Sequence, residues 1–164
     1  VDGLTATNIG LLYMNREDEA LVAATPQACI MLAESVATLS GARVGMVGKG
    51  RTVGKPLIGM LFNRGATVTV CNSKTVDLAA SLKDCDVVFA GVGKPGLLNA
   101  SVIREGQIVI DAGITAVGSK LKGDVDMESV MGIAAAITPV PQGVGQVTTA
   151  LIFKNLLKAI QFQK

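Results

Sequence analysis

Short apolar runs alternate with helical patterns along most of this chain. Five runs rich in Val and Ile have the length of strands that helices cover on both faces: residues 43–47, 67–70, 86–89, 107–110 and 134–138. Helical stretches lie between or after these runs, at residues 54–63, 76–82, 100–104 and 146–161. This alternation predicts a single α/β domain with a Rossmann-type, doubly wound and mostly parallel sheet.

The two ends of the chain carry helical patterns of their own. In the last helix Ile152, Phe153, Leu156, Leu157 and Ile160 share one face, which we expect to pack on the sheet. Near the start, an N-cap and first-turn pair predicts a second helix, over residues 25–36. This pair is Thr25 and Pro26. Residues 2–24 show no strong period, and we interpret them as a connecting segment.

Composition limits the kinds of partner. The chain has 164 residues, of which 49% are hydrophobic and 17% charged, enough for one substantial core. The net charge of +2 is too small to favour nucleic acid or an anionic membrane surface, so we expect neither as a partner. An uncharged stretch at residues 129–153 has membrane-spanning length, but Pro139, Pro141 and several glycines interrupt it. We therefore predict buried strand, loop and helix there.

Cysteine and histidine usage narrows the chemistry further. The three cysteines, Cys29, Cys71 and Cys85, form no C-x-x-C pair, which suits a reducing compartment. We expect a cytoplasmic protein, with an organelle such as the mitochondrion as the alternative. The absence of histidine excludes an imidazole general base and a His-ligated zinc site within this chain, and we expect no metal site.

A glycine-rich turn carries the main functional signal. It directly follows the first predicted strand and directly precedes a helix, with Gly48, Gly50 and Gly54 in the spacing G-x-G-x-x-x-G. Gly48 suits a sharp turn, Gly50 a close approach of backbone to phosphate, and Gly54 close packing of the helix on the sheet. The helix N-terminus offers free N–H donors to a pyrophosphate. We interpret the turn as dinucleotide-binding, the alternative being a turn without a ligand.

The end of the second strand bears on which cofactor is bound. NAD-specific domains place an acidic residue there, whereas this chain has Asn72-Ser73-Lys74. No carboxylate repels a 2′-phosphate, and Ser73, Lys74, Lys49 and Arg51 can bind one, so NADP is favoured over NAD. The alternative is that these are solvated loop residues.

The order of six motifs resembles one enzyme family. The motifs are GKGRTVGKP (48–56), ATVTVCNSKT (66–75), GVGKP (91–95), VIDAGI (109–114), GDVD (123–126) and TPVPQGVGQVT (138–148). In this order they resemble the bifunctional methylenetetrahydrofolate dehydrogenase/cyclohydrolases, specifically their C-terminal NAD(P)-binding domain. The opening Val1-Asp2-Gly3-Leu4 is similar to the linker that enters that domain, so the resemblance covers nearly the whole chain.

The resemblance implies a reaction and a set of site residues. The reaction is oxidation of 5,10-methylenetetrahydrofolate by hydride transfer to NADP, followed by hydrolysis to 10-formyltetrahydrofolate. The implied cofactor-binding residues are Gly48, Lys49, Gly50, Arg51, Val53, Ser73 and Ile114. The implied folate-binding residues are Asp2, Pro139, Val140, Pro141, Gln142, Gly143, Val144 and Gly145. The protein's task would be positioning, because the cofactor supplies the hydride chemistry.

The resemblance also implies how the chain is divided and assembled. Residues 1–40 would be a linker and lead-in helix from a missing N-terminal catalytic domain, and residues 41–164 the NAD(P)-binding domain with its C-terminal helix. The family's catalytic lysine and tyrosine lie in that N-terminal domain, so the catalytic residues stay unknown and the chain alone is expected to be inactive. We expect a homodimer for the intact protein.

Two further hypotheses stay open at this stage. One is a degenerate module that binds NADP without turnover, which is suggested by the missing N-terminal catalytic domain. The other is a different small NADP oxidoreductase of the same fold. Separately, the chain departs from the family pattern at Lys49, Gly50, Asn72, Gln142 and Gln146, which bears on 2′-phosphate binding and on the geometry of the folate-facing loop. Two acidic residues also have two readings: Asp111 and Asp124 can contact a ligand, but we expect them to bind nearby backbone N–H groups.

Overall fold

A parallel five-stranded sheet forms the centre of the molecule. The structure is a computed structural model that describes residues 1–163. The strands of this sheet are β1 (Arg43–Val47), β2 (Thr67–Cys71), β3 (Val87–Ala90), β4 (Ile108–Asp111) and β7 (Ala136–Ile137). Their spatial order is β2-β1-β3-β4-β7, with every neighbouring pair parallel. The chain therefore winds away from β1 in both directions, and the predicted doubly wound fold is confirmed.

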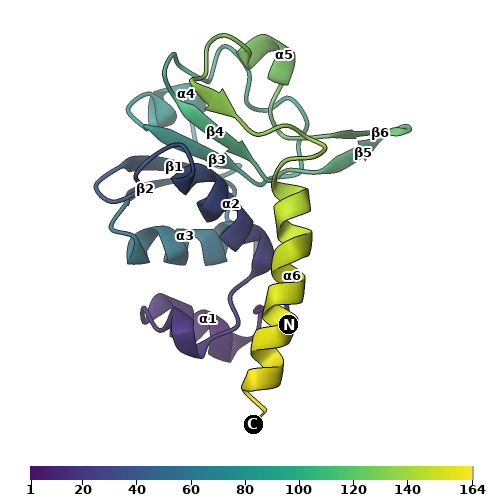
Figure 1. The fold of residues 1–164 in the computed structure, drawn as a ribbon. Coiled ribbons are helices and arrows are strands. Elements are labelled where there is room, and N and C mark those ends of the chain that lie inside the picture. The colour runs from purple at the N-terminus through teal and green to yellow at the C-terminus, as the bar shows by residue number, and fades with distance from the viewer. Residues whose placement is uncertain (164) are drawn as a thin grey trace.

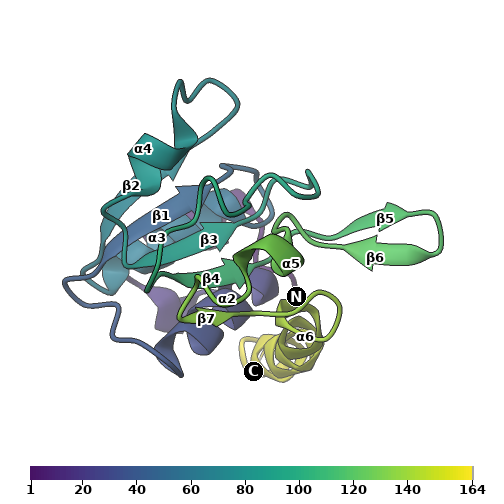
Figure 2. The ribbon, with the colours of Figure 1, turned by 90° about the horizontal axis from the view of Figure 1, so that it is seen from above.

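Helices cover both faces of this sheet (Figures 1 and 2). On one face lie α2 (Ala24–Glu34), α3 (Gly54–Asn63) and α6 (Val144–Gln161), and on the other lie α4 (Leu78–Leu82) and α5 (Met127–Val130). Alternate strand residues point to opposite faces, so Met46 and Phe89 join the first core cluster whereas Val88 and Val109 join the second. The central strands are thus apolar on both sides, which explains their continuous Val and Ile runs.

The first 23 residues contain more structure than predicted. They form the helix α1 (Ala6–Tyr13) and the short 3₁₀ helix η1 (Glu17–Glu19). The Tyr13 hydroxyl donates to the carbonyl of Lys55 (2.7 Å), and the Asn63 amide donates to the carbonyl of Leu12 (2.8 Å), so α1 is fastened to α3. The eight residues of α1 bury only Leu12, which is too little to produce a period in the sequence.

The start of α2 differs from its prediction in one detail. Ala23 is the N-cap residue, and α2 begins at Ala24, so the prediction of Thr25 as the cap was wrong. The Thr25 hydroxyl instead lies 3.4 Å from the hydroxyl of Thr148 in α6. Pro26 still lies in the first turn of α2, where a missing N–H costs no intrahelical bond.

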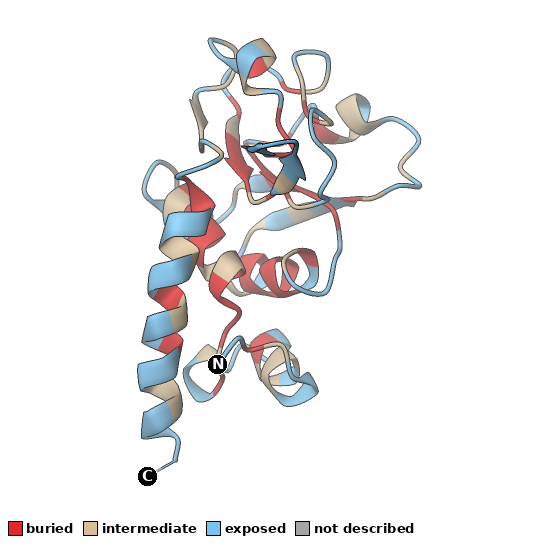
Figure 3. Cartoon of the chain, turned by 90° about the vertical axis from the view of Figure 1, so that its right-hand side faces the viewer, coloured by how far each residue is buried: buried red, intermediate tan, exposed pale blue. Residues whose placement is uncertain are grey.

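The last helix buries a different face from the one predicted. Val144, Leu151 and Asn155 are its buried residues, and this side packs against α2. Phe153 and Leu157 are 64% and 65% exposed, and Figure 3 shows exposed residues along much of α6. The prediction that the face with Phe153 and Leu157 packs on the sheet was therefore wrong. The physical reason lies in the irregular N-terminal segment, whose carbonyl groups need donors from α6.

Those carbonyl groups are bound by two polar side chains of α6. The Asn155 amide donates to the carbonyls of Val1 (2.9 Å) and Val22 (2.7 Å). The Lys158 ammonium donates to the carbonyls of Glu17 (2.9 Å) and Ala20 (2.7 Å). The packed face of α6 therefore combines these polar side chains with Val144 and Leu151, and Phe153 and Leu157 stay exposed.

Three local differences complete the comparison with the predicted elements. Residues 100–104 form a turn rather than the predicted helix, because the Arg104 N–H donates to the Gln107 side chain (2.8 Å) instead of continuing a helix. The helix α4 starts two residues later than predicted, since the Asp77 side chain caps it at the Ala80 N–H (2.9 Å). An unpredicted hairpin, β5 (Thr115–Val117) and β6 (Lys120–Lys122), projects from the sheet (Figure 2).

The uncharged stretch at residues 129–153 forms the predicted strand, loop and helix. It contains β7, the loop that follows it, and the first half of α6. Within residues 1–163, no helix combines the length and the apolar character that a membrane span requires.

Candidate cofactor-binding site

The chain changes winding direction at β1, and the glycine-rich turn lies at that point. The carboxyl ends of β1 and β3 are neighbours in the sheet, so the turn at residues 48–53 faces the loop at residues 91–94. Gly48 has a φ of 103°, and a Cβ there would lie 2.5 Å from the carbonyl oxygen of Gly91. Only glycine lets the two loops touch. In open parallel sheets this crevice is where ligands bind.

The other two glycines of the turn differ in their surroundings. A Cβ on Gly54 would collide with the carbonyl of Gly48, so this glycine lets α3 begin directly against the turn. A Cβ on Gly50 would have no heavy atom within 4 Å, so the backbone there faces open space. Val53, the N-cap of α3, supplies no side-chain acceptor to the first N–H groups of the helix. The positive end of the α3 dipole thus faces the crevice.

Three of the predicted cofactor residues are exposed in this turn or next to it. Lys49 and Arg51 belong to the turn itself, and Ser73 follows β2, whose end is held to the turn by the Gly48 N–H donating to the carbonyl of Cys71 (2.9 Å). The loop with Ser73 has a defined shape, because the Asn72 side chain accepts from the Lys74 N–H (3.0 Å). Hydroxyl, guanidinium and ammonium groups therefore gather at one edge, where a phosphate can be bound.

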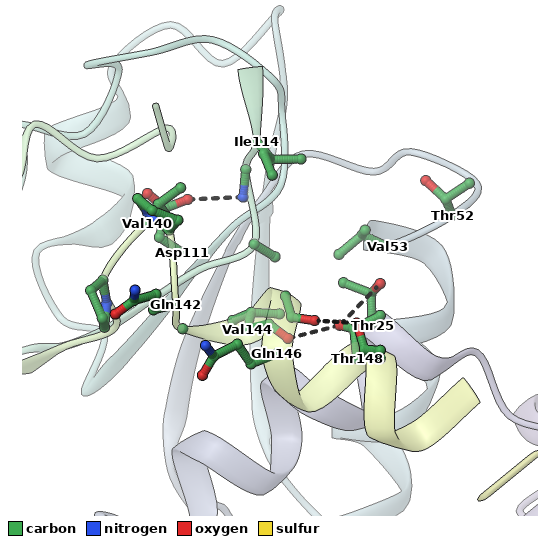
Figure 4. Close-up of a pocket in the computed structure, with 17 residues that line it drawn as sticks. Thr25, Thr52, Val53, Asp111, Ile114, Val140, Gln142, Val144, Gln146 and Thr148 are labelled. Carbon is green, nitrogen blue, oxygen red and sulfur yellow. Dashed lines mark hydrogen bonds between the residues drawn. The ribbon is translucent and has the colours of Figure 1, made fainter. Parts of the chain in front are cut away.

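A cavity of about 590 Å³ adjoins the turn on the β4 side (Figure 4). Val53, Ile114 and residues 139–145 line it, so the structure brings two predicted cofactor residues together with seven of the eight predicted folate-binding residues. The eighth, Asp2, is not a lining residue, since it follows Val1, whose carbonyl is bound by Asn155 in the second half of α6. Gly48, Lys49, Gly50, Arg51 and Ser73 also lie outside this cavity, towards β2.

The cavity is also lined by residues that the sequence did not predict to belong to the site. They are Thr25, Thr52, Asp111, Ala112, Gly113, Thr148 and Thr149. The Thr148 hydroxyl donates to the carbonyl of Val144 (2.8 Å) and lies 3.4 Å from the Thr25 hydroxyl, so the starts of α2 and α6 meet at the cavity wall (Figure 4). No local pattern could have found Thr25, because it comes close to Thr148 only when the two helices pack.

Asp111 and Asp124 are both buried and accept hydrogen bonds from backbone N–H groups, as predicted. Asp111 accepts from the N–H groups of Gly113 (2.9 Å), Asp124 (3.1 Å) and Val125 (2.9 Å). Burial raises the pKa of Asp111, and these three hydrogen bonds oppose the rise. Asp124 is fully buried and accepts three further backbone N–H groups from the loop at residues 92–94.

The acidic and cysteine side chains of residues 1–163 do not cluster as metal ligands would. No group of three or more His, Cys, Asp or Glu side chains there has an arrangement that could hold a metal ion. The cysteines are all buried as free thiols, and Cys71 ends β2, one residue beyond the strand predicted over residues 67–70.

The fold and the glycine turn together define a Rossmann-type dinucleotide-binding domain. The family model described as tetrahydrofolate dehydrogenase/cyclohydrolase, NAD(P)-binding domain, matches residues 23–164. The chain belongs to this family.

Relatives and solved structures agree with this assignment. The chain is 49% identical over 164 residues to the bifunctional protein FolD of Desulforamulus reducens. This match covers 99% of this chain and 57% of that protein. It is 46% identical to the bifunctional protein FolD of Thermotoga maritima, covering 100% of this chain and 60% of that protein. The chain thus spans less than two thirds of the length of these relatives.

Two crystal structures share its fold closely. The bifunctional 5,10-methylenetetrahydrofolate dehydrogenase/cyclohydrolase of Thermoplasma acidophilum matches with a TM-score of 0.93 and 42% identity, over 99% of this chain and 58% of that one. The Trypanosoma brucei enzyme, complexed with NADP cofactor and inhibitor, matches with a TM-score of 0.89 and 36% identity, again over 99% and 58%.

Proposed function

We propose that this chain is the NADP-binding part of a bifunctional methylenetetrahydrofolate dehydrogenase/cyclohydrolase. The activity would be oxidation of 5,10-methylenetetrahydrofolate to the methenyl form, followed by hydrolysis to 10-formyltetrahydrofolate. The observation that carries the proposal is the position of the glycine turn where the chain changes its winding direction. Beside the turn lies a cavity that residues 139–145 line. Family membership and the named activity of the relatives support the reaction.

The residues present fit a phosphorylated dinucleotide. Open space at Gly50 and the N-terminus of α3 suit a pyrophosphate, with Gly48 shaping the turn. Lys49, Arg51 and Ser73 would bind the 2′-phosphate, and Val53 and Ile114 would border the other half of the cofactor. When bound, NADP accepts the hydride, and the chain's own task is to orient the cofactor and to exclude water.

Residues 139–145 would form the folate-facing wall of the cavity. Gly143 allows the tight packing of this loop, because a Cβ there would collide with the carbonyl of Pro139. Gln142 has a φ of 78°, so its exposed side chain is carried on a left-handed backbone. Asp2 would reach a folate only from outside the cavity that the chain itself forms.

The assembly and the location are part of the same proposal. We expect a homodimer of the intact protein, supported by the projecting hairpin β5–β6, whose residues Val117 and Leu121 are exposed. A cytoplasmic location is supported by three buried free thiols. Hydrolase activity rests on the bifunctional relatives alone.

Calorimetric titration of the chain with NADP and with NAD tests the cofactor assignment. We expect tighter binding of NADP, and the Lys49→Ala/Arg51→Ala double variant should lose that preference while keeping its affinity for NAD. Arg104→Ala is a matched control, because this arginine is exposed and precedes the amino end of β4, whereas the glycine turn follows the carboxyl end of β1. Binding of neither nucleotide would contradict the proposed function. A repeat with a folate substrate tests residues 139–145.

A further inference from the structure

A single carboxylate holds the loop that follows β3. Asp124 accepts hydrogen bonds from three successive backbone N–H groups, those of Val92 (2.5 Å), Gly93 (3.1 Å) and Lys94 (2.6 Å). Successive N–H groups that converge in this way form an anion-binding nest. The chain fills this nest with its own side chain, so these N–H groups are not free to bind a phosphate.

Asp124 is itself held in place from β4. Its backbone N–H and that of Val125 donate to the Asp111 carboxylate at the end of β4 (3.1 and 2.9 Å). Two glycines make room for the carboxylates, because a Cβ on Gly113 would collide with Asp124 and one on Gly123 with Asp111. A continuous set of hydrogen bonds therefore connects β4 to the loop after β3.

The loop held in this way borders the proposed cofactor site. The Gly91 carbonyl touches Gly48 of the glycine turn, and Gly91 also lies against the Val53 side chain. In a dinucleotide-binding domain the adenosine half lies over the strand after the turn, here β2, and the pyrophosphate lies at the turn. The nicotinamide half must then extend towards β3 and β4, where residues 92–94 and the cavity with Ile114 are found.

We propose that Asp124 is a positioning residue that holds residues 92–94 as the nicotinamide-side wall of the cofactor crevice. This inference rests on the proposed NADP-binding function. Asp124 does not touch the cofactor in this account, because it is fully buried beneath the loop. Its carboxylate acts through the three N–H groups, and it also confines the pyrophosphate to the turn after β1 by occupying the second nest.

The test compares a whole cofactor with its adenosine half. Asp124→Asn replaces one acceptor oxygen by an NH₂ group, so at least one N–H of residues 92–94 loses its partner. We expect the Kd for NADP, measured by calorimetry, to rise at least about tenfold. The Kd for adenosine 2′,5′-bisphosphate, which lacks the nicotinamide half, should stay within about twofold of the wild-type value.

Two more variants complete the design. Asp126→Asn changes an exposed carboxylate two residues away that caps no helix N–H, and it should leave both Kd values unchanged. Gly93→Ala disturbs the same loop while leaving Asp124 intact, since Gly93 has a φ of 75° but its Cβ would meet no atom closer than 3.9 Å. Gly93→Ala should show the same selective loss, and it carries the test if Asp124→Asn does not fold.

Each result decides between the two proposals. Equal weakening of NADP and the bisphosphate, or an unchanged NADP affinity in both loop variants, would overturn the positioning role while leaving cofactor binding intact. Failure of the wild-type chain to bind NADP would instead refute the proposed function, and the positioning role with it.

Discussion

Gly48 and Gly50 stand two residues apart in one turn, yet a methyl group would meet different surroundings at each. Gly48 is buried, has a positive φ and touches the carbonyl of Gly91. Gly50 is exposed and open on its Cβ side. Glycine is therefore needed for folding at the first position and, under the proposed function, for ligand approach at the second.

This contrast predicts two separable losses. Gly48→Ala should lower the free energy of unfolding by about 2–3 kcal/mol, because it adds both backbone strain and a clash. Gly50→Ala should change stability by less than about 1 kcal/mol but weaken NADP binding severalfold. Denaturant unfolding and calorimetric titration of both variants check the prediction. A stable Gly48→Ala protein would contradict the account of the turn.

Cys29 predicts a pH dependence of stability. Burial raises the pKa of its thiol from 9.0 to about 12. Above pH 9 the unfolded thiol releases its proton while the native thiol keeps it, so the native state binds more protons and stability falls as pH rises towards 12. At pH 10 this loss amounts to about 1 kcal/mol. Denaturant unfolding should show a shallower alkaline loss in Cys29→Ala than in the wild type.

The comparison of Cys29→Ala with the wild type isolates this residue. Cys71 and Cys85 are present in both proteins, and any cavity left by the lost sulfur has the same cost at every pH. Parallel stability curves between pH 8 and pH 11 would show that Cys29 ionises freely and would contradict its burial.

At the scale of elements, α6 packs with a face that carries polar as well as apolar side chains. Asn155 and Lys158 bind four carbonyl groups of the first 22 residues. A buried carbonyl without a donor costs free energy comparable to a lost hydrogen bond, whereas an exposed Phe or Leu is tolerated. The polar requirement therefore outweighs the exposure of Phe153 and Leu157.

Removal of the Asn155 amide should accordingly be costly. Asn155→Ala deletes the donor to the carbonyl of Val1 and one of the donors to Val22, and we expect the free energy of unfolding to fall by about 2 kcal/mol. Lys154→Ala, one residue earlier and exposed, should change it by no more than about 0.5 kcal/mol. Thermal or urea unfolding of both variants measures the difference. Equal stability of the two variants would argue against this polar contact.

At the scale of the whole molecule, the N-terminal segment belongs to the same folded body as the sheet. Leu12, Ala20 and Val22 are buried in the cluster that includes Met46 and Phe89. The segment is held at one side by α3, through Tyr13, and at the other by α6. It therefore contributes to the core rather than only leading into it.

Deletion of residues 1–21 should consequently destabilise the remaining chain. Loss of Leu12 and Ala20 removes part of the core cluster and exposes apolar surface on α3, and we expect the free energy of unfolding to fall by at least about 3 kcal/mol. The melting temperature followed by circular dichroism checks this expectation. An unchanged melting temperature would mean that residues 1–21 act as a linker only, as the sequence pattern suggested.

The elements that sequence predicted best are those with strong local patterns. The Val and Ile runs located all five strands of the sheet within one or two residues, since a strand buried on both faces must be apolar throughout. The glycine turn was located for a similar reason, because positive φ and close backbone approach restrict the residue type at Gly48. The motif order then identified the family.

The tertiary structure decided what depends on contacts between distant residues. It showed that α1 exists, that α6 buries the side with Leu151 and Asn155, and that Thr25 and Thr148 meet at the cavity wall. It also joined Asp124 to residues 92–94, about thirty positions away in the chain. The sequence by itself determined the sheet, the turn and the family through local backbone and burial requirements. Which groups satisfy one another across the molecule followed only from packing, because a hydrogen bond between distant residues leaves no periodic trace in the chain.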